Sequence, residues 1–567
     1  MEASNPTPAT STSNVEDSAP DRIQKEEKQD GVEKQNGDED VALPAGDAPE
    51  PEYATGLRLF LIMFTISMST LLVGLEVGII STAIPVITDK FRRLNDVGWY
   101  GSATFLLVGA SSPLFGKIYK YLNVKFVYLA SVGIFLVGSV VAAAAPNSAS
   151  VIVGRGLQGL GISGVLGGSA LVIKYVAQPK QHPVLIGTWM GVFMVSTILG
   201  PVIGGAFTSE VSWRWCFWIN LPLGGPIVVL LLLFLNVPKH IKPAPATWKE
   251  IILQLDLPGF SLLLASLVCL TLALQWGGQT KAWSEVPVIA TLVLWVSFTL
   301  IFVIIEWLQG LRAIIPLELL KTRITWANAL YSYMSNAVDY QVIFYLPIYF
   351  QSIHGQSAIM SGVNTIPFLA FFAFGAMVGG TAVGKTHLLQ PYQLTSALLM
   401  TAGVALFYTL DIDSSKARYI GPQVLFGFGV GLGNQIPMIA VQNFSKPEDV
   451  ANSTGIMLMC QSISGAYFIA VAQSIFSNCM LHALKTSAPG ISAFTVINSG
   501  ASDLRQVFKG ADLDAVLGAY MVGIKDVFAC ALTGSAFTVL LALVIPLKKL
   551  PNHDSKETEE KEKVASV

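Results

Sequence analysis

Long apolar runs separated by short polar segments occupy most of this 567-residue chain. Each run is close to the roughly 20 apolar residues that a helix needs to cross the hydrocarbon core of a bilayer. The runs are bounded by segments rich in Pro, Gly, Asn and charged residues, and fourteen of them can be counted, which predicts an all-α polytopic membrane protein with fourteen transmembrane helices. They are centred near residues 70, 108, 135, 162, 196, 226, 267, 297, 338, 370, 401, 430, 464 and 537.

The order of the runs predicts a 6+2+6 arrangement. Two six-helix halves, 56–238 and 324–547, flank a linker, 239–323, that contributes two additional helices. The segments 1–55 and 548–567 are charged and poor in apolar residues, so we expect disordered tails there. Paired halves are a recurrent plan in transporters, and they place the substrate site between the halves near the middle of the membrane.

Charge is scarce and unevenly distributed. Charged residues make up 13% of the chain and hydrophobic residues 52%, whereas about a quarter of a soluble globular chain is charged. An even number of crossings puts both tails on one side, and the short loops of that side hold fifteen Lys and Arg residues against seven on the other. The positive-inside bias makes this side cytosolic. The polar segment 477–525 then becomes the one long external loop.

Three ionisable residues lie inside predicted membrane helices, where each costs roughly 2.5–3.5 kcal/mol on insertion scales: Glu76, Arg155 and Asp339. Glu76 and Arg155 lie about eight and about six residues below the outer ends of their runs, so their depths match at 1.5 Å per residue. We expect them to form a pair, with a purely structural ion pair as the alternative. Asp339 has polar and aromatic neighbours that suit a cavity wall, and a position near the outer interface is the alternative. The candidates for the substrate cavity are Gln158, Asn336, Tyr340, Gln341, Asn434 and Gln435.

The run after Gly187 has two glycine pairs spaced one helical turn apart. Gly187 and Gly191 form one pair and Gly200 and Gly204 the other, so two bare patches lie where another helix could approach closely. Pro201 interrupts the same run, which is tolerated where neighbouring helices or an aqueous cavity satisfy the freed carbonyl group. We therefore expect this helix to line an internal space.

These residues also carry a family resemblance. Gly200, Pro201, Gly204 and Gly205, followed by WRWCFWINLPLG, resemble the antiporter motif and following loop of the major facilitator superfamily, most closely its fourteen-span drug:proton antiporter branch. RGLQGLGISG, which begins at Arg155, resembles the fourth-helix motif, whose arginine is associated with proton coupling. LEVGIISTAIPVI resembles the first-helix pattern, with Glu76 where an aspartate is usual.

A third segment, GKIYKYLNVK, resembles the cytosolic signature of the superfamily. Gly116, Lys117 and Lys125 match this signature, which implies a gating loop. Lys120 stands where an aspartate is usual and Asn123 where a glycine is usual. The charge contact that the aspartate makes elsewhere cannot be transferred to this chain.

The resemblance implies a fungal plasma-membrane efflux pump that exports small organic molecules, such as toxins, drugs or secondary metabolites, in exchange for protons. It associates Arg155 with proton coupling, and the depth of the two carboxylates in the membrane makes Glu76 and Asp339 the leading proton carriers. We expect a monomer with both termini in the cytosol. A proton-linked importer of siderophores and a vacuolar basic amino-acid transporter are the alternatives, the latter in a vacuolar membrane. The expected partners are protons, a small-molecule substrate and lipid.

Other classes of protein are disfavoured. GGTAVGKT at 379–386 fits the phosphate-binding loop pattern, but that motif works only between a strand and a helix, whereas here it ends an apolar run. Its glycine spacing is typical of helix packing. We find no catalytic or metal-ligand constellation and no basic stripe for nucleic acid, so we expect no enzyme and no cofactor. A transporter-like receptor would need structured tails. The five scattered cysteines suit buried small residues.

Overall fold

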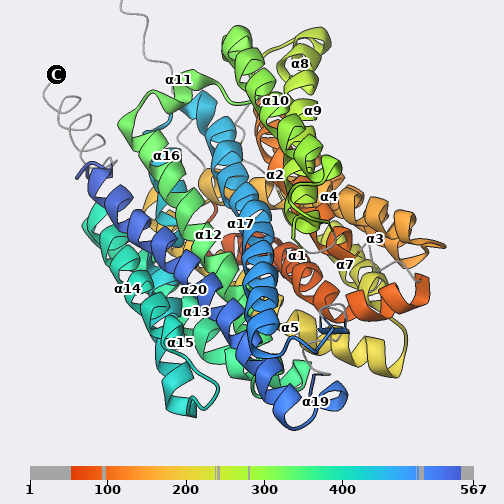
Figure 1. Ribbon diagram of the computed structural model, residues 1–567. Helices are drawn as coiled ribbons and strands as arrows, with labels where there is room; N and C mark the ends of the chain where they lie inside the picture. The colour runs from red at the N-terminus through yellow and green to blue at the C-terminus, as the bar shows by residue number, and fades with distance from the viewer. Residues whose placement is uncertain are drawn as a thin grey trace, which may run out of the picture. The chain divides into compact units, whose positions relative to one another are not determined.

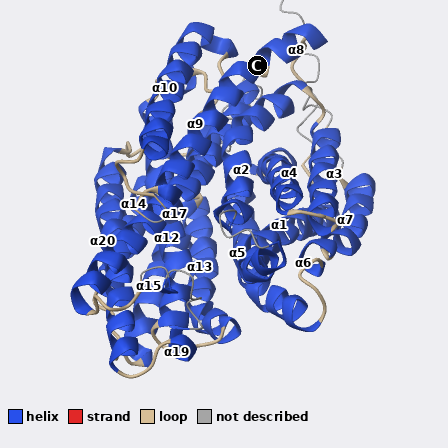
Figure 2. Ribbon diagram, turned by 45° about the vertical axis from the view of Figure 1, so that its right-hand side comes forward, coloured by secondary structure: helices blue, strands red, loops and turns tan. Residues whose placement is uncertain are grey.

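The computed structural model describes residues 53–91, 97–235, 238, 243–278, 281–492, 495–496 and 504–550, and helices account for nearly all of this part of the chain (Figures 1 and 2). The first half contains α1 (Gly56–Phe91), α2 (Val97–Tyr121), α3 (Val124–Ala143), α4 (Ser148–Val176), α5 (His182–Glu210), α6 (Trp215–Trp218) and α7 (Asn220–Phe234). The linker contains α8 (Trp248–Gln254), α9 (Leu257–Trp276), α10 (Val286–Gln309) and α11 (Leu317–Leu320). The second half contains α12 (Arg323–Ser352), α13 (Ala358–Thr386), α14 (Gln390–Tyr408), α15 (Lys416–Asn434), α16 (Ile436–Phe444), α17 (Val450–Ser487), α19 (Leu504–Val507) and α20 (Ala511–Val544). The described residues also include three short 3₁₀ helices, η2 (Pro179–Gln181), η3 (Gly310–Arg312) and η4 (Pro447–Asp449).

Every predicted run coincides with a helix, because each run centre lies within the bounds of one of them. The twelfth run is divided at Gln435 into α15 and α16. Among the described residues, eleven helical segments are both long and apolar enough to cross a membrane. The runs that fall short of this criterion are α2, α12 and α14, which carry more polar residues.

The expected external loop at 477–525 is much shorter than predicted. The helix α17 continues to Ser487 and α20 begins at Ala511, so most of that polar segment is helical. A helix can continue through polar residues once it projects beyond the apolar layer, because water and neighbouring helices can form hydrogen bonds with the polar side chains there. The expected tails, apart from residues 53–55 and 548–550, and part of the linker at 239–242 lie outside the described residues.

The helices of the two halves pack into two groups, which Figure 2 shows beside each other. Within the first half α1 packs on α5 and α3 on α4, and within the second half α14 packs on α15 and α20. The groups meet along two lines, where α5 packs on α13 and α2 on α17. The linker helix α9 packs on α10 and also touches both α2 and α17.

Candidate functional site

A buried ion pair joins two helices of the first half. Arg155 on α4 donates from Nη1 to Oε1 of Glu76 on α1, and the side chains are 1% and 0% exposed. The predicted contact between these residues is therefore confirmed. Pairing within the protein offsets part of the free-energy cost of burying each charge. Removal of one partner from a buried ion pair typically lowers folding stability by about 3–5 kcal/mol.

Neutral side chains complete the network around the Glu76 carboxylate. Asn220 on α7 donates from Nδ2 to the second carboxylate oxygen at 2.6 Å and to Ser139 Oγ at 3.1 Å. Gln158 accepts from Arg155 Nη1 at 3.2 Å and donates to Ser139 Oγ at 2.9 Å. Each carboxylate oxygen therefore has a donor, and the network fastens α1, α3, α4 and α7 together.

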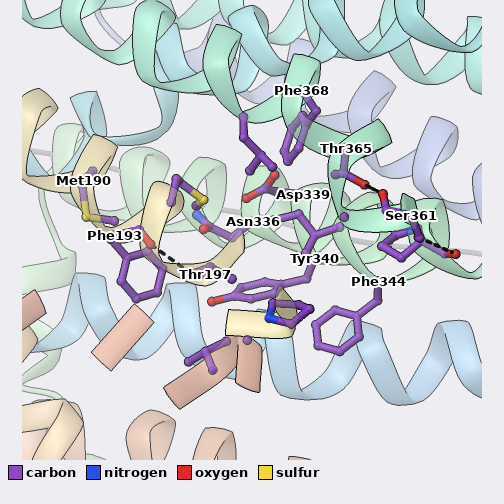
Figure 3. A pocket seen from close by; sticks show the side chains of 18 of the residues that line it. Met190, Phe193, Thr197, Asn336, Asp339, Tyr340, Phe344, Ser361, Thr365 and Phe368 are labelled. Atoms are coloured by element: carbon purple, nitrogen blue, oxygen red, sulfur yellow. Dashed lines mark hydrogen bonds between the residues drawn. The ribbon is translucent and has the colours of Figure 1, made fainter. Parts of the chain in front are cut away.

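A cavity of about 750 Å³ lies between the two halves. Its walls come from α1, α4 and α5 on one side and from α12, α13, the α15–α16 junction and α17 on the other (Figure 3). The lining residues extend from the middle of the bundle to the end at which α1, α5 and α12 finish and α13 begins. Apolar and aromatic side chains predominate, as is usual for sites that take drug-sized molecules.

Asp339 lies on the wall of this cavity, near the middle of α12. Its side chain points into the same space as those of Asn336 and Tyr340 (Figure 3). The residue is 2% exposed, and its Oδ1 atom has no hydrogen-bond partner. The placement agrees with the cavity-wall interpretation and not with a position near the outer interface.

The remaining cavity candidates divide into two groups. Asn434 and Gln435 line the cavity, at the junction of α15 and α16. Gln158 and Gln341 are not among its lining residues, so the structure corrects their assignment. Gln158 belongs to the Glu76 network, and Gln341 donates to the backbone oxygen of Ala337 in its own helix at 3.0 Å.

Both glycine patches of α5 make close helix contacts. A side chain at Gly200 would place its Cβ atom 2.5 Å from Cα of Gly78 on α1, and one at Gly204 would meet Thr82. At the other end of the helix, a Cβ atom on Gly187 would lie 2.6 Å from the carbonyl oxygen of Ala376 on α13. The absence of side chains therefore lets α5 approach one helix in each half.

The same helix lines the cavity, as expected from its proline. Pro201 and Gly205 are among the lining residues, together with Trp189, Phe193 and Thr197. Pro201 lies inside the helix without ending it. The α5 helix therefore couples three surfaces: the contact with α1, the contact with α13, and the cavity wall.

The end of the bundle opposite the cavity is closed by contacts between the halves. Lys120 on α2 pairs with Asp449 in η4 at 3.0 Å. Lys174 on α4 donates to Asn443 Oδ1 on α16 at 2.6 Å. A Cβ atom at Gly116 would lie 2.8 Å from the carbonyl oxygen of Ala451, so α2 and α17 nearly touch there.

The two matching lysines of the cytosolic signature have other partners. Lys117 is 1% exposed and donates from Nζ to the carbonyl oxygens of Gln254 and Arg312, each at 2.6 Å. Lys125 donates to the carbonyl oxygen of Leu232 at 2.7 Å. Lys117 thus binds the chain just before α9 and just after α10, whereas Lys120 makes the contact between the halves.

The phosphate-loop pattern lies within a helix. Residues 379–386 form the last two turns of α13, which continues to Thr386. A Cβ atom on Gly375 would lie 2.5 Å from the carbonyl oxygen of Phe428 on α15, and one on Gly379 or Gly380 would meet another helix backbone still more closely. The glycines therefore serve helix packing, as their spacing predicts.

Two functional candidates escaped the sequence analysis. Asn220 completes the Glu76 network, although only its place in the motif after Pro201 drew attention to it. Gln461 on α17 lines the cavity, and its Nε2 atom has no partner. The available signal was a glutamine in a helical run of apolar and small residues. The five cysteines are all free.

Two helical groups around a central cavity, with charged residues buried in the walls and beside them, define a membrane transporter. The family model described as "Major Facilitator Superfamily" matches residues 66–469. The chain belongs to the major facilitator superfamily, whose members are transporters and not enzymes.

Several curated relatives cover nearly the whole chain. The "Dehydrocurvularin exporter" of Alternaria cinerariae is 69% identical over 511 residues, which are 90% of this chain and 88% of the relative. "Efflux pump notK" of Aspergillus sp. (strain MF297-2) is 66% identical over 505 residues, 89% of this chain and 90% of the relative. These names favour an exporter over the importers considered from the sequence.

Solved structures share the fold at low sequence identity. The human organic anion transporter MFSD10 (TETRAN) matches with a TM-score of 0.55 and 13% identity, over 86% of this chain and 100% of that one. The proton:xylose symporter XylE matches with a TM-score of 0.54 and 12% identity, over 87% of this chain and 98% of that one. At such identities the likeness establishes the fold alone.

Proposed function

We propose that this protein exports a small organic molecule, a secondary metabolite, a toxin or a drug, across the plasma membrane in exchange for protons, and that it works as a monomer. The relatives named as exporters and as an efflux pump support the direction. Multidrug resistance would follow where the cavity accepts foreign compounds of similar chemistry.

The observation that carries the proposal is the pair of carboxylates at the cavity. Asp339 lines the cavity, and one of its carboxylate oxygens is buried without a hydrogen-bond partner. Glu76 is sealed by Arg155 and Asn220, and the next two residues of α1, Val77 and Gly78, line the same cavity. Ionisable groups at membrane depth are costly and mark proton or substrate pathways. We assign proton binding to both carboxylates, and we assign to Arg155 the control of when Glu76 binds and releases its proton.

The proposed topology is fourteen helices in a 6+2+6 arrangement with both tails in the cytosol. The eleven long apolar segments account for most crossings, and α2, α12 and α14 complete the count, because their polar residues face other helices and the cavity. The excess of Lys and Arg places the Lys120–Asp449 contact at the cytosolic face. The cavity therefore faces outward in this conformation.

An exchange cycle follows from this arrangement. Protons from outside bind the carboxylates while the cavity is outward-facing, and the substrate leaves. Separation of the contacts at Lys120 and Lys174 then opens the cavity to the cytosol, where protons depart and the next substrate binds. In such a cycle one site between the two halves is exposed alternately to the outside and to the cytosol. Each ligand must then bind the outward-facing and the cytosol-facing conformations with different affinity.

The test uses purified protein in sealed vesicles with a radiolabelled candidate metabolite from the producing cells. An imposed pH gradient should drive accumulation without ATP, and a protonophore should abolish it. Inclusion of ATP alone should have no effect. Transport that needs ATP and persists with the protonophore would refute proton exchange, and accumulation in the opposite direction would refute export.

A further inference from the structure

The two halves contribute different chemistry to the cavity wall. The first half supplies Thr82, Thr197 and Thr208, and each hydroxyl donates to a backbone oxygen of its own helix. The indole N–H of Trp189 donates away from the cavity, to Thr70 at 2.6 Å. The donors on this wall are therefore already engaged, and the wall offers a bound molecule mainly apolar surface.

The second half supplies three polar atoms that have no partner. They are Oδ1 of Asp339, Oε1 of Gln435 and Nε2 of Gln461, and all three residues line the cavity. An unpaired buried polar atom costs about 1–3 kcal/mol. Such atoms are normally satisfied by protein, water or a ligand. Two of these atoms are acceptors and one is a donor. All three are buried in the wall, so a bound molecule would meet them after a small rotation of each side chain toward the cavity.

The charge on the wall is also one-sided. Among the described residues that line the cavity, Asp339 is the single charged side chain, and none is Lys, Arg or His. The nearby Arg155 is engaged by Glu76 and Gln158 and is not a lining residue. An anionic group in the cavity would therefore meet a carboxylate with no cation to compensate it, which disfavours anions.

Aromatic and sulfur-containing side chains face the polar atoms across the cavity. Met190 and Phe193 on α5 lie on one side, and Asp339 on α12 lies on the other (Figure 3). Phe344 and Phe368 extend the apolar surface within the second half. A molecule that fits both walls has an apolar or aromatic body and one polar edge.

We propose that the cavity selects a drug-sized amphipathic molecule without negative charge, whose hydroxyl or N–H groups donate to Asp339 and Gln435 and whose carbonyl group accepts from Gln461. This inference rests on the proposed transport function and names the class of its substrate. Gln435 and Gln461 become specificity-determining residues. Each amide group can rotate to present either its oxygen or its nitrogen, so both residues tolerate a donor or an acceptor on the ligand. A deprotonated Asp339 can only accept hydrogen bonds.

Binding to the purified protein tests the class. The first probe is naringenin, which has free hydroxyl groups and a ring carbonyl group. The second is its ether methylated at every hydroxyl, which lacks donors but keeps the carbonyl group, and the third is its sulfate ester, which is anionic. Quenching of tryptophan fluorescence can report binding, since Trp189 lines the cavity. Naringenin should bind at least about tenfold more tightly than the ether, the equivalent of one hydrogen bond, and the sulfate should bind most weakly.

Variants connect this preference with the three residues. Gln435→Leu should weaken naringenin binding about tenfold and leave the ether nearly unchanged, because the ether has no hydroxyl group to donate to Gln435. Gln461→Leu should weaken binding of both, because both keep the ring carbonyl group. Asp339→Asn should strengthen binding of the sulfate. Gln423→Leu is the matched control, since Gln423 is buried on α15 with an unpartnered Oε1 atom but is not a lining residue. It should leave all three affinities unchanged.

The outcomes separate this inference from the proposed function. Equal binding of the three probes, failure of naringenin to bind, or equal loss of naringenin and ether binding in Gln435→Leu would overturn the substrate class. Each measurement is made in detergent without a pH gradient. A failure of proton-driven transport in vesicles would therefore leave the binding preference standing, and the reverse also holds.

Discussion

The two carboxylate oxygens of Glu76 have different kinds of hydrogen-bond partner. One accepts from the cationic Arg155 and the other from the neutral Asn220. Loss of the charge on either side of the ion pair changes what this site can bind, whereas the surrounding helices keep their apolar contacts.

Glu76→Gln should stop proton-driven transport while substrate binding survives. The amide keeps the size of the side chain and can still accept from Arg155, but it cannot release a proton. Transport in vesicles should fall at least about tenfold in samples with equal amounts of folded protein. Thermal unfolding in detergent should move to a lower temperature, because the buried Arg155 keeps its charge and loses its counter-charge. Arg155→Ala should also abolish transport, because Glu76 loses its counter-charge and would hold a proton permanently. The neutral, protonated carboxyl group can stay buried, so the helix bundle should remain folded. Normal pH-driven transport by either variant would contradict the assignment.

At the residue scale the sequence was informative wherever a charge lay in an apolar run. Glu76 and Arg155 could be paired from depth alone, because helical rise converts sequence position into position across the membrane. Gln158 and Gln341 could not be placed correctly, since depth does not say which way a side chain points. Side-chain direction depends on the rotation of each helix against its neighbours, which a single sequence does not encode in a local pattern.

The contact between α1 and α5 gives a prediction at the scale of the element. A Cβ atom at Gly200 would lie 2.5 Å from Gly78, closer than packed atoms allow. Gly200→Leu should therefore force the helices apart, with a cost of at least about 1–3 kcal/mol from overpacking. Transport should fall at least about tenfold in vesicles with equal amounts of inserted protein.

Gly133→Leu on α3 is the control for this substitution. A Cβ atom at Gly133 would meet nothing within 4 Å, so the variant should transport like wild type. Equal activity of the Gly200 and Gly133 variants would show that close approach of α1 and α5 is unnecessary for the cycle.

At the element scale the helices themselves were predictable, but their lengths were less so. Apolar runs fix where a helix crosses, because unsatisfied backbone groups are not tolerated in lipid. They do not fix where it stops, and α17 and α20 extend well into the polar segment that was expected to be a loop. The helices α9 and α10 were expected as an added pair, but nothing in their sequences indicated that Lys117 fastens them to α2.

The whole molecule is held in its present conformation partly by the Lys120–Asp449 pair. This pair is about one-fifth exposed on each side, so it should contribute only about 0.2–1 kcal/mol. Lys120→Ala should shift the balance between cavity orientations by up to about fivefold toward the opposite state. Distances between spin labels on α2 and α17 at this end of the bundle can measure the shift.

The charge-exchanged double variant Lys120→Asp with Asp449→Lys should restore the original distances. Lys321→Ala removes a lysine whose partner, Glu318, lies in the same short segment, so it should have no effect on the distances. Failure of the double variant to recover the wild-type distribution would mean that the pair does not hold the halves together. The sequence could not predict which conformation predominates, because alternative conformations of one protein typically differ by only a few kcal/mol.

The position of α9 has a consequence for compounds that reach the protein through the lipid. The halves meet along α2–α17 and along α5–α13, and α9 and α10 share a hydrophobic cluster with α2 and α17 that contains Leu106, Leu267, Phe302 and Ile463. This cover shields the first meeting line from acyl chains, whereas α5 and α13 keep exposed apolar side chains such as Leu199 and Phe374. A lipophilic compound that partitions into the inner leaflet would then have a single lateral entrance, so the linker helices make substrate loading from the bilayer one-sided.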